Sequence, residues 1–348
     1  MQLQEWNGAV EHERVVFGTD PAAGYRGIIA IHSTKLGPAV GGTRFWNYAG
    51  DEEALKDALR LSRGMTYKNA LAGLPFGGGK SIIIGNNKTL EREAIFRAHG
   101  RFIETFGGRY IAGEDVGTST SDMEYVRLET NHVAGLADKS GDPSPHTARG
   151  VFRAIQATAR YRWGLDDVSG KTVAVQGCGN VGYHLCKELY RAGARLLVAD
   201  TEPSKAQRCA TEFGALEVGS DEIFGVEADI FAPCALGGIL NSDTIPRLKV
   251  EIVAGAANNQ LLEPVHGDML EERNILYAPD YVANAGGIIN GGCIELLGWD
   301  RTVALAKIDG IYDTLLTIFE IAAKDKIPSY AAADRLAESR LAAGILES

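Results

Sequence analysis

A lysine that follows three glycines is the first candidate for a reactive group. The stretch Leu74–Ile84 reads LPFGGGKSIII, with Lys80 between the glycines and a purely apolar run. A phosphate-binding loop of the form G-x-x-x-x-G-K-[ST] would need glycine at Leu74, and Gly73 lies one residue out of register. The run Ser81–Ile84 also indicates a buried strand, whereas a phosphate loop opens a helix. We therefore expect the glycines, which lack side chains, to leave room for a ligand beside Lys80.

Lys68 and Asp115 are of the right types to act with Lys80. A single lysine is usually a solvated surface cation, but an exposed ammonium does not fit a position between Gly79 and a buried strand. In an apolar pocket near a second cation a lysine loses its proton more easily, because desolvation and like charge both disfavour the ammonium. It can then act as a base near neutral pH. Asp115 follows a predicted strand and could move a second proton, whereas a turn or capping role fits Asp122 better.

A glycine-rich turn later in the chain indicates a dinucleotide site. Residues Gly177–Gly182 read GCGNVG between a strand-like run and a helical one, and Asp200 ends the next strand-like run. Glycines at these three spacings permit a tight turn, close approach of a pyrophosphate and close helix packing, respectively. Asp200 would accept hydrogen bonds from the ribose hydroxyls, and no cation follows it to hold a 2′-phosphate, so NAD is preferred to NADP. The cofactor residues expected here are Gly177, Gly179, Asn180, Val181, Gly182 and Asp200.

The remaining pattern supplies the elements that would position these groups. Up to about residue 135, a helix over Asp51–Leu71 stands among strand-like runs at 27–32, 39–45, 80–84 and 108–112. The polar stretch from Asp138 to Pro145 is a candidate hinge. Beyond it, helices alternate with short apolar runs at 171–176, 196–199, 229–232, 251–254 and 275–278. This alternation predicts a doubly wound, mostly parallel sheet of the Rossmann type.

The predicted fold class is therefore α/β with two domains. Residues 1–135 would form a mixed-sheet domain for substrate binding, catalysis and oligomerisation, and residues 145–327 a Rossmann dinucleotide-binding domain, with a catalytic cleft between them. The tail from Thr302 predicts two helices broken at Ile327-Pro328. We expect the last helix, from about 328 to 348, to pack back on the first domain or to form a subunit contact.

Composition excludes several classes of partner. The 348 residues carry a net charge of -10 without a basic cluster interleaved with aromatics, so neither nucleic acid nor an anionic membrane is an expected partner. No segment approaches the ~18 uncharged apolar residues of a membrane span, and the first residues do not form a signal peptide. The five cysteines lack CxxC spacing and look like reduced thiols, so we expect a cytoplasmic protein without a metal site.

Seven motifs resemble the glutamate, leucine, phenylalanine and valine dehydrogenase family. They are GPAVGGTR, ALRLSRGMTYKNALAGLPFGGGK, GEDVGT, QGCGNVGYHLC, DIFAPCALGG, AGAANNQL and LYAPDYVANAGGIIN, which span nearly the whole chain. The wording is most similar to the leucine dehydrogenases, including the C-terminal IPSYAAADRLAESR, and next to the phenylalanine dehydrogenases. The resemblance implies a homo-oligomeric enzyme that uses NAD to convert an L-amino acid to its 2-oxo acid and ammonia, and the reverse.

The resemblance also implies roles for the matching residues. Lys68 would bind the substrate α-carboxylate, Lys80 would activate water, and Asp115 would move protons at the amino nitrogen. Hydride would leave Cα to give an imine, and water would add to it before ammonia leaves. Asn258 and Asn284 are implied to hold the substrate and the nicotinamide, and Thr147, Cys234 and Ala235 to line the cofactor.

The candidate walls of the substrate pocket contain no cation, which indicates a hydrophobic substrate. The walls are Val40, Gly41, Gly42, Gly113, Ile288 and Gly291. The leucine pattern usually carries Ala at position 113 and Val at position 291, so glycine at both would enlarge the cavity. Overall similarity therefore favours leucine or another branched-chain amino acid, while the pocket favours phenylalanine or tryptophan, and both remain open.

Two other interpretations of the nucleotide motif exist. A hydroxy-acid dehydrogenase would use a His or Arg with a carboxylate, and the seven histidines form no such arrangement. A non-catalytic NAD-sensing module would have no need of Lys68, Lys80 and Asp115. An amino acid dehydrogenase, unlike a hydroxy-acid dehydrogenase, requires ammonia for the reductive reaction. Unlike an NAD-sensing module, it loses its function in the variant Lys80→Ala.

Overall fold

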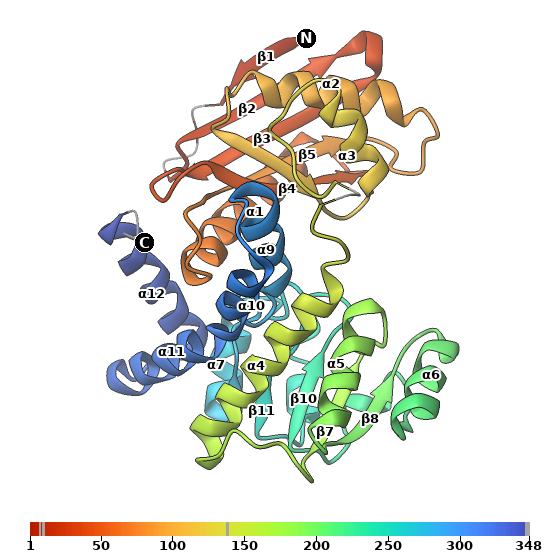
Figure 1. Ribbon diagram of the computed structural model, residues 1–348, viewed down its shortest axis with the longest axis vertical. Helices are drawn as coiled ribbons and strands as arrows, with labels where there is room; N and C mark the ends of the chain where they lie inside the picture. The colour runs from red at the N-terminus through yellow and green to blue at the C-terminus, as the bar shows by residue number, and fades with distance from the viewer. Residues whose placement is uncertain (7, 9–10, 137–138, 345–348) are drawn as a thin grey trace. The chain divides into compact units, whose positions relative to one another are not determined.

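The computed structural model describes residues 1–6, 8, 11–136 and 139–344, drawn in Figure 1. The chain divides into two compact units. The first consists of Met1–Gly141, Gly291–Trp299 and Ala337–Ser348, and the second of Asp142–Asn290 and Asp300–Leu336. Asp138, in the predicted hinge, lies outside the described residues.

The first unit is built on a mixed sheet of six strands. These are β1 (Gln2–Glu5), β2 (Arg14–Asp20), β3 (Tyr25–Ser33), β4 (Ala39–Trp46), β5 (Gly77–Ile84) and β6 (Tyr110–Glu114). Their order is β1-β2-β3-β5-β4-β6, with β4 parallel to both β5 and β6 and the other pairs antiparallel. Because β4 and β6 are parallel neighbours, the residues that follow each strand emerge at one edge of the sheet.

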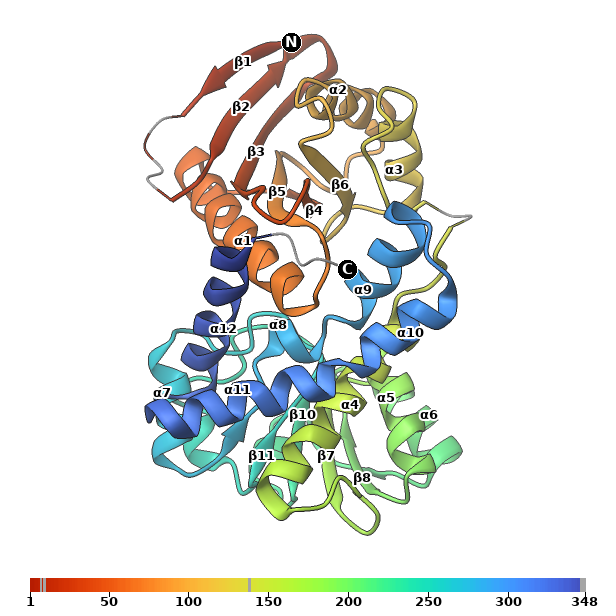
Figure 2. The ribbon, with the colours of Figure 1, turned by 60° about the vertical axis from the view of Figure 1, so that its left-hand side comes forward.

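Helices cover both faces of this sheet, as Figure 2 shows. Helix α1 (Asp51–Leu71) packs Ala54 and Ala58 against Ile28 and Ile82 on one face. Helices α2 (Arg92–Glu104) and α3 (Thr120–Arg127) pack on the opposite face, in a cluster that contains Ile29, the strand neighbour of Ile28. Alternate residues of a strand point to opposite faces, so each strand contributes to both clusters. Helix α1 has three acids in its first turn and Lys68 in its last, as the helix dipole favours.

The second unit contains a fully parallel sheet of six strands. These are β7 (Thr172–Gln176), β8 (Arg195–Ala199), β9 (Leu216–Glu217), β10 (Ile230–Pro233), β11 (Ile252–Val253) and β12 (Leu276–Tyr277). Their order is β12-β11-β10-β7-β8-β9. Strand order reverses between β7 and β10, and in open α/β sheets ligands bind beyond the carboxyl ends of the strands at this point.

The helices from residue 144 onward belong to the second unit, except that Gly291, a distorted segment after it and the part of the last helix from Ala337 onward belong to the first unit. The helices are α4 (Ser144–Trp163), α5 (Asn180–Arg191), α6 (Pro203–Phe213), α7 (Val265–Glu272), α8 (Asp280–Ala283), α9 (Gly286–Gly291), α10 (Arg301–Asp309), α11 (Ile311–Asp325) and α12 (Ser329–Ala343). A π-helical segment follows at Gly292–Leu296. Glu295 in this segment accepts hydrogen bonds from the Gly135 amide (2.8 Å) and the Ser140 hydroxyl.

The predicted fold class is confirmed, with corrections of detail. Each predicted strand run overlaps a strand, and the helix over Asp51–Leu71 has the predicted bounds. Strands β1, β2 and β9 were not predicted. The tail forms three helices instead of two, because the chain also breaks at Gly310, between α10 and α11. Among the described residues, no helix has both the length and the apolar character needed to cross a membrane.

Candidate active site

Lys80 and Asp115 form a direct ion pair in the first unit. Lys80 lies in β5 and is only 5% exposed, and Asp115 follows β6. The distance from Lys80 Nζ to Asp115 Oδ2 is 2.8 Å. Burial alone would raise the pKa of Asp115, but the charges of Lys80 and Arg44 outweigh it and lower that pKa to about 2. Asp115 is therefore a carboxylate throughout the neutral range.

Arg44 is a second cation on the same carboxylate oxygen, and the sequence analysis did not single it out. Its Nε donates to Asp115 Oδ2 at 3.1 Å, and its Nη1 donates to Asp57 Oδ2 at 2.8 Å. Asp57 belongs to α1 and also accepts from the Tyr48 hydroxyl at 2.7 Å. Lys80 is thus paired with a carboxylate. From the sequence we expected a second cation near Lys80 and did not predict this ion pair.

The glycines before Lys80 serve packing, which corrects the expectation that they leave space for a ligand. A Cβ on Gly77 would stand 1.9 Å from the Ser33 carbonyl oxygen, and one on Gly78 would stand 2.0 Å from the Thr66 amide nitrogen. A Cβ on Gly79 would meet the Tyr110 ring at 2.7 Å. None of the three has a positive φ. They allow α1 and β3 to approach the backbone of β5, which brings the helix that carries Lys68 against the strand that carries Lys80.

The predicted pocket glycines fall into two groups. Gly41 and Gly42 lie in β4, where a Cβ would stand 1.8 Å from the Gly79 carbonyl oxygen or 2.8 Å from Asp115 Cβ, respectively. Gly113, opposite Gly42 in β6, would bring a Cβ no closer than 4.0 Å to a neighbouring atom, here the Ala134 carbonyl oxygen. At Gly291 the corresponding contact is the Ser140 hydroxyl oxygen, also at 4.0 Å. Open space therefore borders Gly113 and Gly291, whereas Gly41 and Gly42 are closely packed.

The remaining predicted substrate residues lie on three elements. Lys68 is half-buried in the last turn of α1, and Val40 is buried in β4, one residue before Gly41. Ile288 is half-buried in α9.

Behind β5 lies a buried polar network that the sequence analysis also missed. His99 of α2 is fully buried, and its ring nitrogens lie 2.8 Å from the Tyr25 hydroxyl and 3.1 Å from the Ser81 hydroxyl. The Tyr110 hydroxyl donates to the Gly41 carbonyl oxygen at 2.7 Å. Burial lowers the pKa of His99 to about 3, so the ring stays neutral. This network joins β3, β4, β5 and β6 beneath Lys80.

In the second unit, the three glycines of the nucleotide motif have three different environments. Gly177 has φ of 99° and faces Ala235 and Cys234, and Gly182 approaches the Gly177 carbonyl oxygen so closely that a Cβ would stand 1.9 Å from it. A Cβ on Gly179, at the N-terminus of α5, would meet no atom within 4 Å. The backbone at Gly179 is therefore open to a ligand, at a helix N-terminus that favours phosphate.

Asp200 joins the end of β8 to this turn. Its Oδ2 accepts the Cys178 amide at 2.7 Å, and its Oδ1 accepts the Glu202 amide at 2.8 Å. Asn180 and Val181 open helix α5, and Cys234 and Ala235 follow β10 on the other side of Gly177. Six predicted cofactor residues therefore lie together at the carboxyl ends of β7, β8 and β10. They are Gly177, Asn180, Val181, Asp200, Cys234 and Ala235.

A second cluster in this unit contains the predicted asparagines. Asn284 is buried, and its amide donates to the Ala256 carbonyl oxygen at 3.0 Å and to Asn258 Oδ1 at 2.8 Å. Thr147 of α4 lies next to Gly287 of α9, where a Cβ would stand 2.8 Å from the Thr147 hydroxyl. Asn258 and Asn284 are therefore direct partners.

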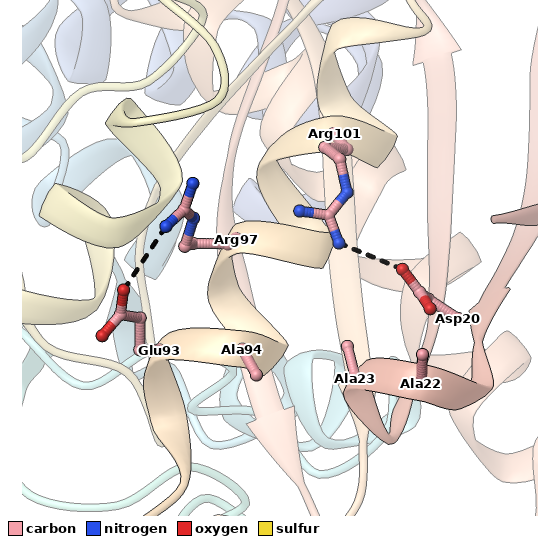
Figure 3. Close-up of a pocket in the computed structure, with 7 residues that line it drawn as sticks. All are labelled: Asp20, Ala22, Ala23, Glu93, Ala94, Arg97 and Arg101. Atoms are coloured by element: carbon pink, nitrogen blue, oxygen red, sulfur yellow. Dashed lines mark hydrogen bonds and ion pairs between the residues drawn. The ribbon is translucent and has the colours of Figure 1, made fainter.

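A shallow hollow of about 490 Å³ lies elsewhere on the first unit. It is lined by the 3₁₀ turn η1 (Pro21–Ala23) and by α2, and none of the predicted site residues borders it. Figure 3 shows its charged side chains paired with one another, Arg101 with Asp20 and Arg97 with Glu93. No group of three or more potential metal ligands occurs within the described part of the chain.

Comparison with known proteins identifies the family. Residues 12–132 match "Glu/Leu/Phe/Val dehydrogenase, dimerisation domain", and residues 142–205 and 200–297 match "Glutamate/Leucine/Phenylalanine/Valine dehydrogenase". Leucine dehydrogenase from Geobacillus stearothermophilus is 54% identical over 98% of this chain and 94% of its own length. L-tryptophan dehydrogenase from Nostoc punctiforme is 50% identical over 98% of this chain and 96% of its own length. Phenylalanine dehydrogenase from Lysinibacillus sphaericus is 48% identical over 93% of this chain and 87% of its own length.

Solved structures agree with the sequence comparison. The crystal structure of L-tryptophan dehydrogenase from Nostoc punctiforme aligns with a TM-score of 0.86 over 95% of this chain and 96% of that chain. The chain therefore belongs to the Glu/Leu/Phe/Val dehydrogenase family. Within that family it is an amino acid dehydrogenase, most similar among these relatives to the leucine enzyme.

Proposed function

We propose that this enzyme uses NAD to oxidise a hydrophobic L-amino acid, principally leucine, to the 2-oxo acid and ammonia, and catalyses the reverse reductive amination. The observation that carries the proposal is the ion pair of the buried Lys80 with the half-buried Asp115, held beside the glycines of β4. The pair offers an amine and a carboxylate 2.8 Å apart, so a proton can pass between them without an intervening water. The identity of 54% with a leucine dehydrogenase supports the choice of amino acid.

Three polar groups of the first unit have a task in this reaction. Lys68 binds the α-carboxylate, and Lys80 takes a proton from the water that adds to the imine carbon. Asp115 takes and returns protons at the substrate nitrogen, which leaves as ammonia. NAD, held by the second unit, would supply the acceptor for the hydride that leaves Cα.

We assign NAD to the glycine-rich turn of the second unit. The open backbone at Gly179 and the N-terminus of α5 suit a pyrophosphate. Asp200 retains free lone pairs for the ribose hydroxyls after accepting two amides, and its charge disfavours a 2′-phosphate. Asn180, Val181, Cys234 and Ala235 would complete the nucleotide site, and Asn258, Asn284 and Thr147 would hold the nicotinamide side.

An aromatic substrate is the second candidate. Space beside Gly113 and Gly291 could accept a larger side chain than leucine, and the 50% identity with a tryptophan dehydrogenase points the same way. Val40 and Ile288 would supply apolar walls for either substrate.

We also propose that the enzyme is a cytoplasmic homo-oligomer that assembles through its first unit. The family description of residues 12–132 as a dimerisation domain supports the assembly. The cysteines are all unpaired, as in a reducing compartment. Light scattering of the purified protein would give the subunit number, and a monomer at all concentrations would contradict the proposal.

The deciding experiment is a panel of L-amino acids with NAD or NADP, followed by NADH or NADPH absorbance. We expect leucine and other hydrophobic amino acids to be oxidised with NAD, and the reverse reaction to require ammonia. Activity with glutamate alone would overturn the pocket assignment, and equal use of NADP would overturn the role of Asp200. Lys80→Ala and Asp115→Asn should each reduce kcat by about 10²-fold or more, since each removes a proton-transfer group.

A further inference from the structure

Asp115 is held by more than the lysine that shares the reaction with it. Its Oδ2 accepts from Lys80 Nζ at 2.8 Å and from Arg44 Nε at 3.1 Å. The side chain of Arg44 is 19% exposed and that of Asp115 is 21% exposed, so solvent screens this contact only weakly. Arg44 lies in β4, between the close-packed Gly42 and the end of the strand, where it can reach both Asp115 and α1.

Arg44 is itself fixed by a second carboxylate. Asp57 of α1 accepts from Arg44 at 2.8 Å through the same oxygen that accepts from the Tyr48 hydroxyl, and its other oxygen accepts from Arg60 at 3.0 Å. Burial would raise the pKa of Asp57, but the Tyr48 hydrogen bond and the charges of Arg44 and Arg60 lower it. Arg44 is in turn disfavoured by burial, but Asp115 and Asp57 raise its pKa, so all three groups remain charged.

We propose that Arg44 is a positioning residue for proton transfer: it orients the Asp115 carboxylate toward Lys80 and keeps it ionised, and Asp57 with Tyr48 holds Arg44 in place. The contact with Asp57 also ties this carboxylate to α1, the helix whose last turn carries Lys68. This inference rests on the proposed function, because it assigns Arg44 to the proton-transfer step given there to Asp115.

The charges around Asp115 determine the expected pH effect. Lys80 of β5 and Arg44 of β4 favour its ionised form, whereas Tyr110 and Glu114 of β6 and Asp57 of α1 place no positive charge near it. Removal of Arg44 therefore raises the pKa of Asp115, typically by about one to three units for the loss of one adjacent cation. Protonation then removes the Asp115 carboxylate, the group that acts at the substrate nitrogen, at a higher pH than in the wild type, where its pKa is about 2.

The test is the pH dependence of kcat/KM for L-leucine with saturating NAD in the wild type and four variants. We expect Arg44→Met to move the acid limb of the profile upward by about one to three pH units, and Arg44→Lys to move it less because a cation remains. Asp57→Asn should also move it, since Arg44 loses its anchor. Arg60→Ala is the matched control, because Arg60 contacts the far oxygen of Asp57 with a side chain 54% exposed, and should leave the profile unchanged. An acid limb in Arg44→Met that coincides with the wild type would overturn the proposal.

Two further measurements separate a positioning role from a structural one. Isotope-edited NMR of the Asp115 carboxyl, in enzyme without substrate, should show its titration at higher pH in Arg44→Met than in the wild type. Near neutral pH, where Asp115 stays ionised, Arg44→Met should also lower activity because the carboxylate is no longer oriented, and this decrease should appear in kcat more than in KM for leucine, because Lys68 still binds the α-carboxylate. If Arg44→Met does not fold, Arg44→Lys and Asp57→Asn carry the same comparison.

The variant Asp115→Asn distinguishes an error in the proposed role of Asp115 from an error in the inference about Arg44. If it keeps full activity, the proposed role of Asp115 is wrong and the inference about Arg44 falls with it. If it is inactive while the Asp115 titration and the acid limb are unchanged in both Arg44 variants, the inference alone is wrong.

Discussion

Gly113 in β6 and Gly291 at the end of α9 are the two predicted pocket glycines at which a side chain could be added without a close contact. Gly113 and Gly291 each have open space where a side chain would stand, unlike Gly41 and Gly42. We predict that the double variant Gly113→Ala, Gly291→Val lowers kcat/KM for phenylalanine relative to leucine by about tenfold or more, since one methylene in an apolar pocket is worth about 1 to 3 kcal/mol.

The same amino acid panel measures this ratio. Gly225→Ala, in the second unit, is a control that should leave it unchanged, since a Cβ there would meet only the Glu222 carbonyl oxygen, at 3.8 Å. A ratio of phenylalanine to leucine that rises in the double variant would show that these glycines do not border the substrate.

Individual site residues could be predicted where they belong to a short, recognisable sequence motif. Lys80 follows a glycine triplet, and Gly177–Gly182 carries its own spacing, so both could be selected from short windows. Arg44 could not be assigned a partner, because it meets Asp115 across 71 residues of sequence. One signal was available: Arg44 is a charged residue inside a run predicted as a strand, and charges in buried strands are rare unless paired.

Packing of α1 on β5 depends on the glycines of the strand. We predict that Gly78→Ala destabilises the first unit by about 1 to 3 kcal/mol or more, because its Cβ would stand 2.0 Å from the Thr66 amide nitrogen, a backbone atom that cannot move aside. Gly64→Ala, on the exposed side of α1 with no atom within 4 Å, should stabilise by about 0.5 to 1 kcal/mol. Urea unfolding of the two variants checks the opposite signs, and equal effects would contradict this account of the triplet.

Many regular elements coincide with apolar runs that are visible in the sequence. Helix α1 and the strands flanking the nucleotide turn were predicted from periodicity and from the residues that end them. Strands β1 and β9 were missed because all their residues are exposed, so neither contains a buried apolar run. Strand β2 was missed although it contains Val15, Val16 and Phe17. The π-helical segment at Gly292–Leu296 has no short sequence signature, and the partners of its Glu295, Gly135 and Ser140, are more than 150 residues away in the sequence.

The stability of the molecule as a whole should depend on pH through a buried histidine. The pKa of His99 is lowered by burial to about 3, whereas an unfolded histidine titrates near 6.5. Between these values the unfolded chain binds a proton that the folded chain does not, so the free energy of unfolding falls as pH decreases, by up to about 1.4 kcal/mol per pH unit.

We predict that His99→Gln, which does not titrate, loses less stability than the wild type on going from neutral pH to the lower end of this range. Urea midpoints of the first unit at several pH values measure the difference between the two proteins. A difference that stays constant with pH would show that His99 does not couple protonation to unfolding.

The hydrogen bonds of Asp200 also constrain attempts to redesign coenzyme preference. This carboxylate fastens the glycine-rich turn through the Cys178 amide and the start of the next loop through the Glu202 amide. Exchange of Asp200 for a small neutral residue to admit a 2′-phosphate would leave both amides without their acceptor and loosen the turn to which we assign the pyrophosphate. A variant selective for NADP therefore needs a compensating acceptor for these amides as well as a new cation.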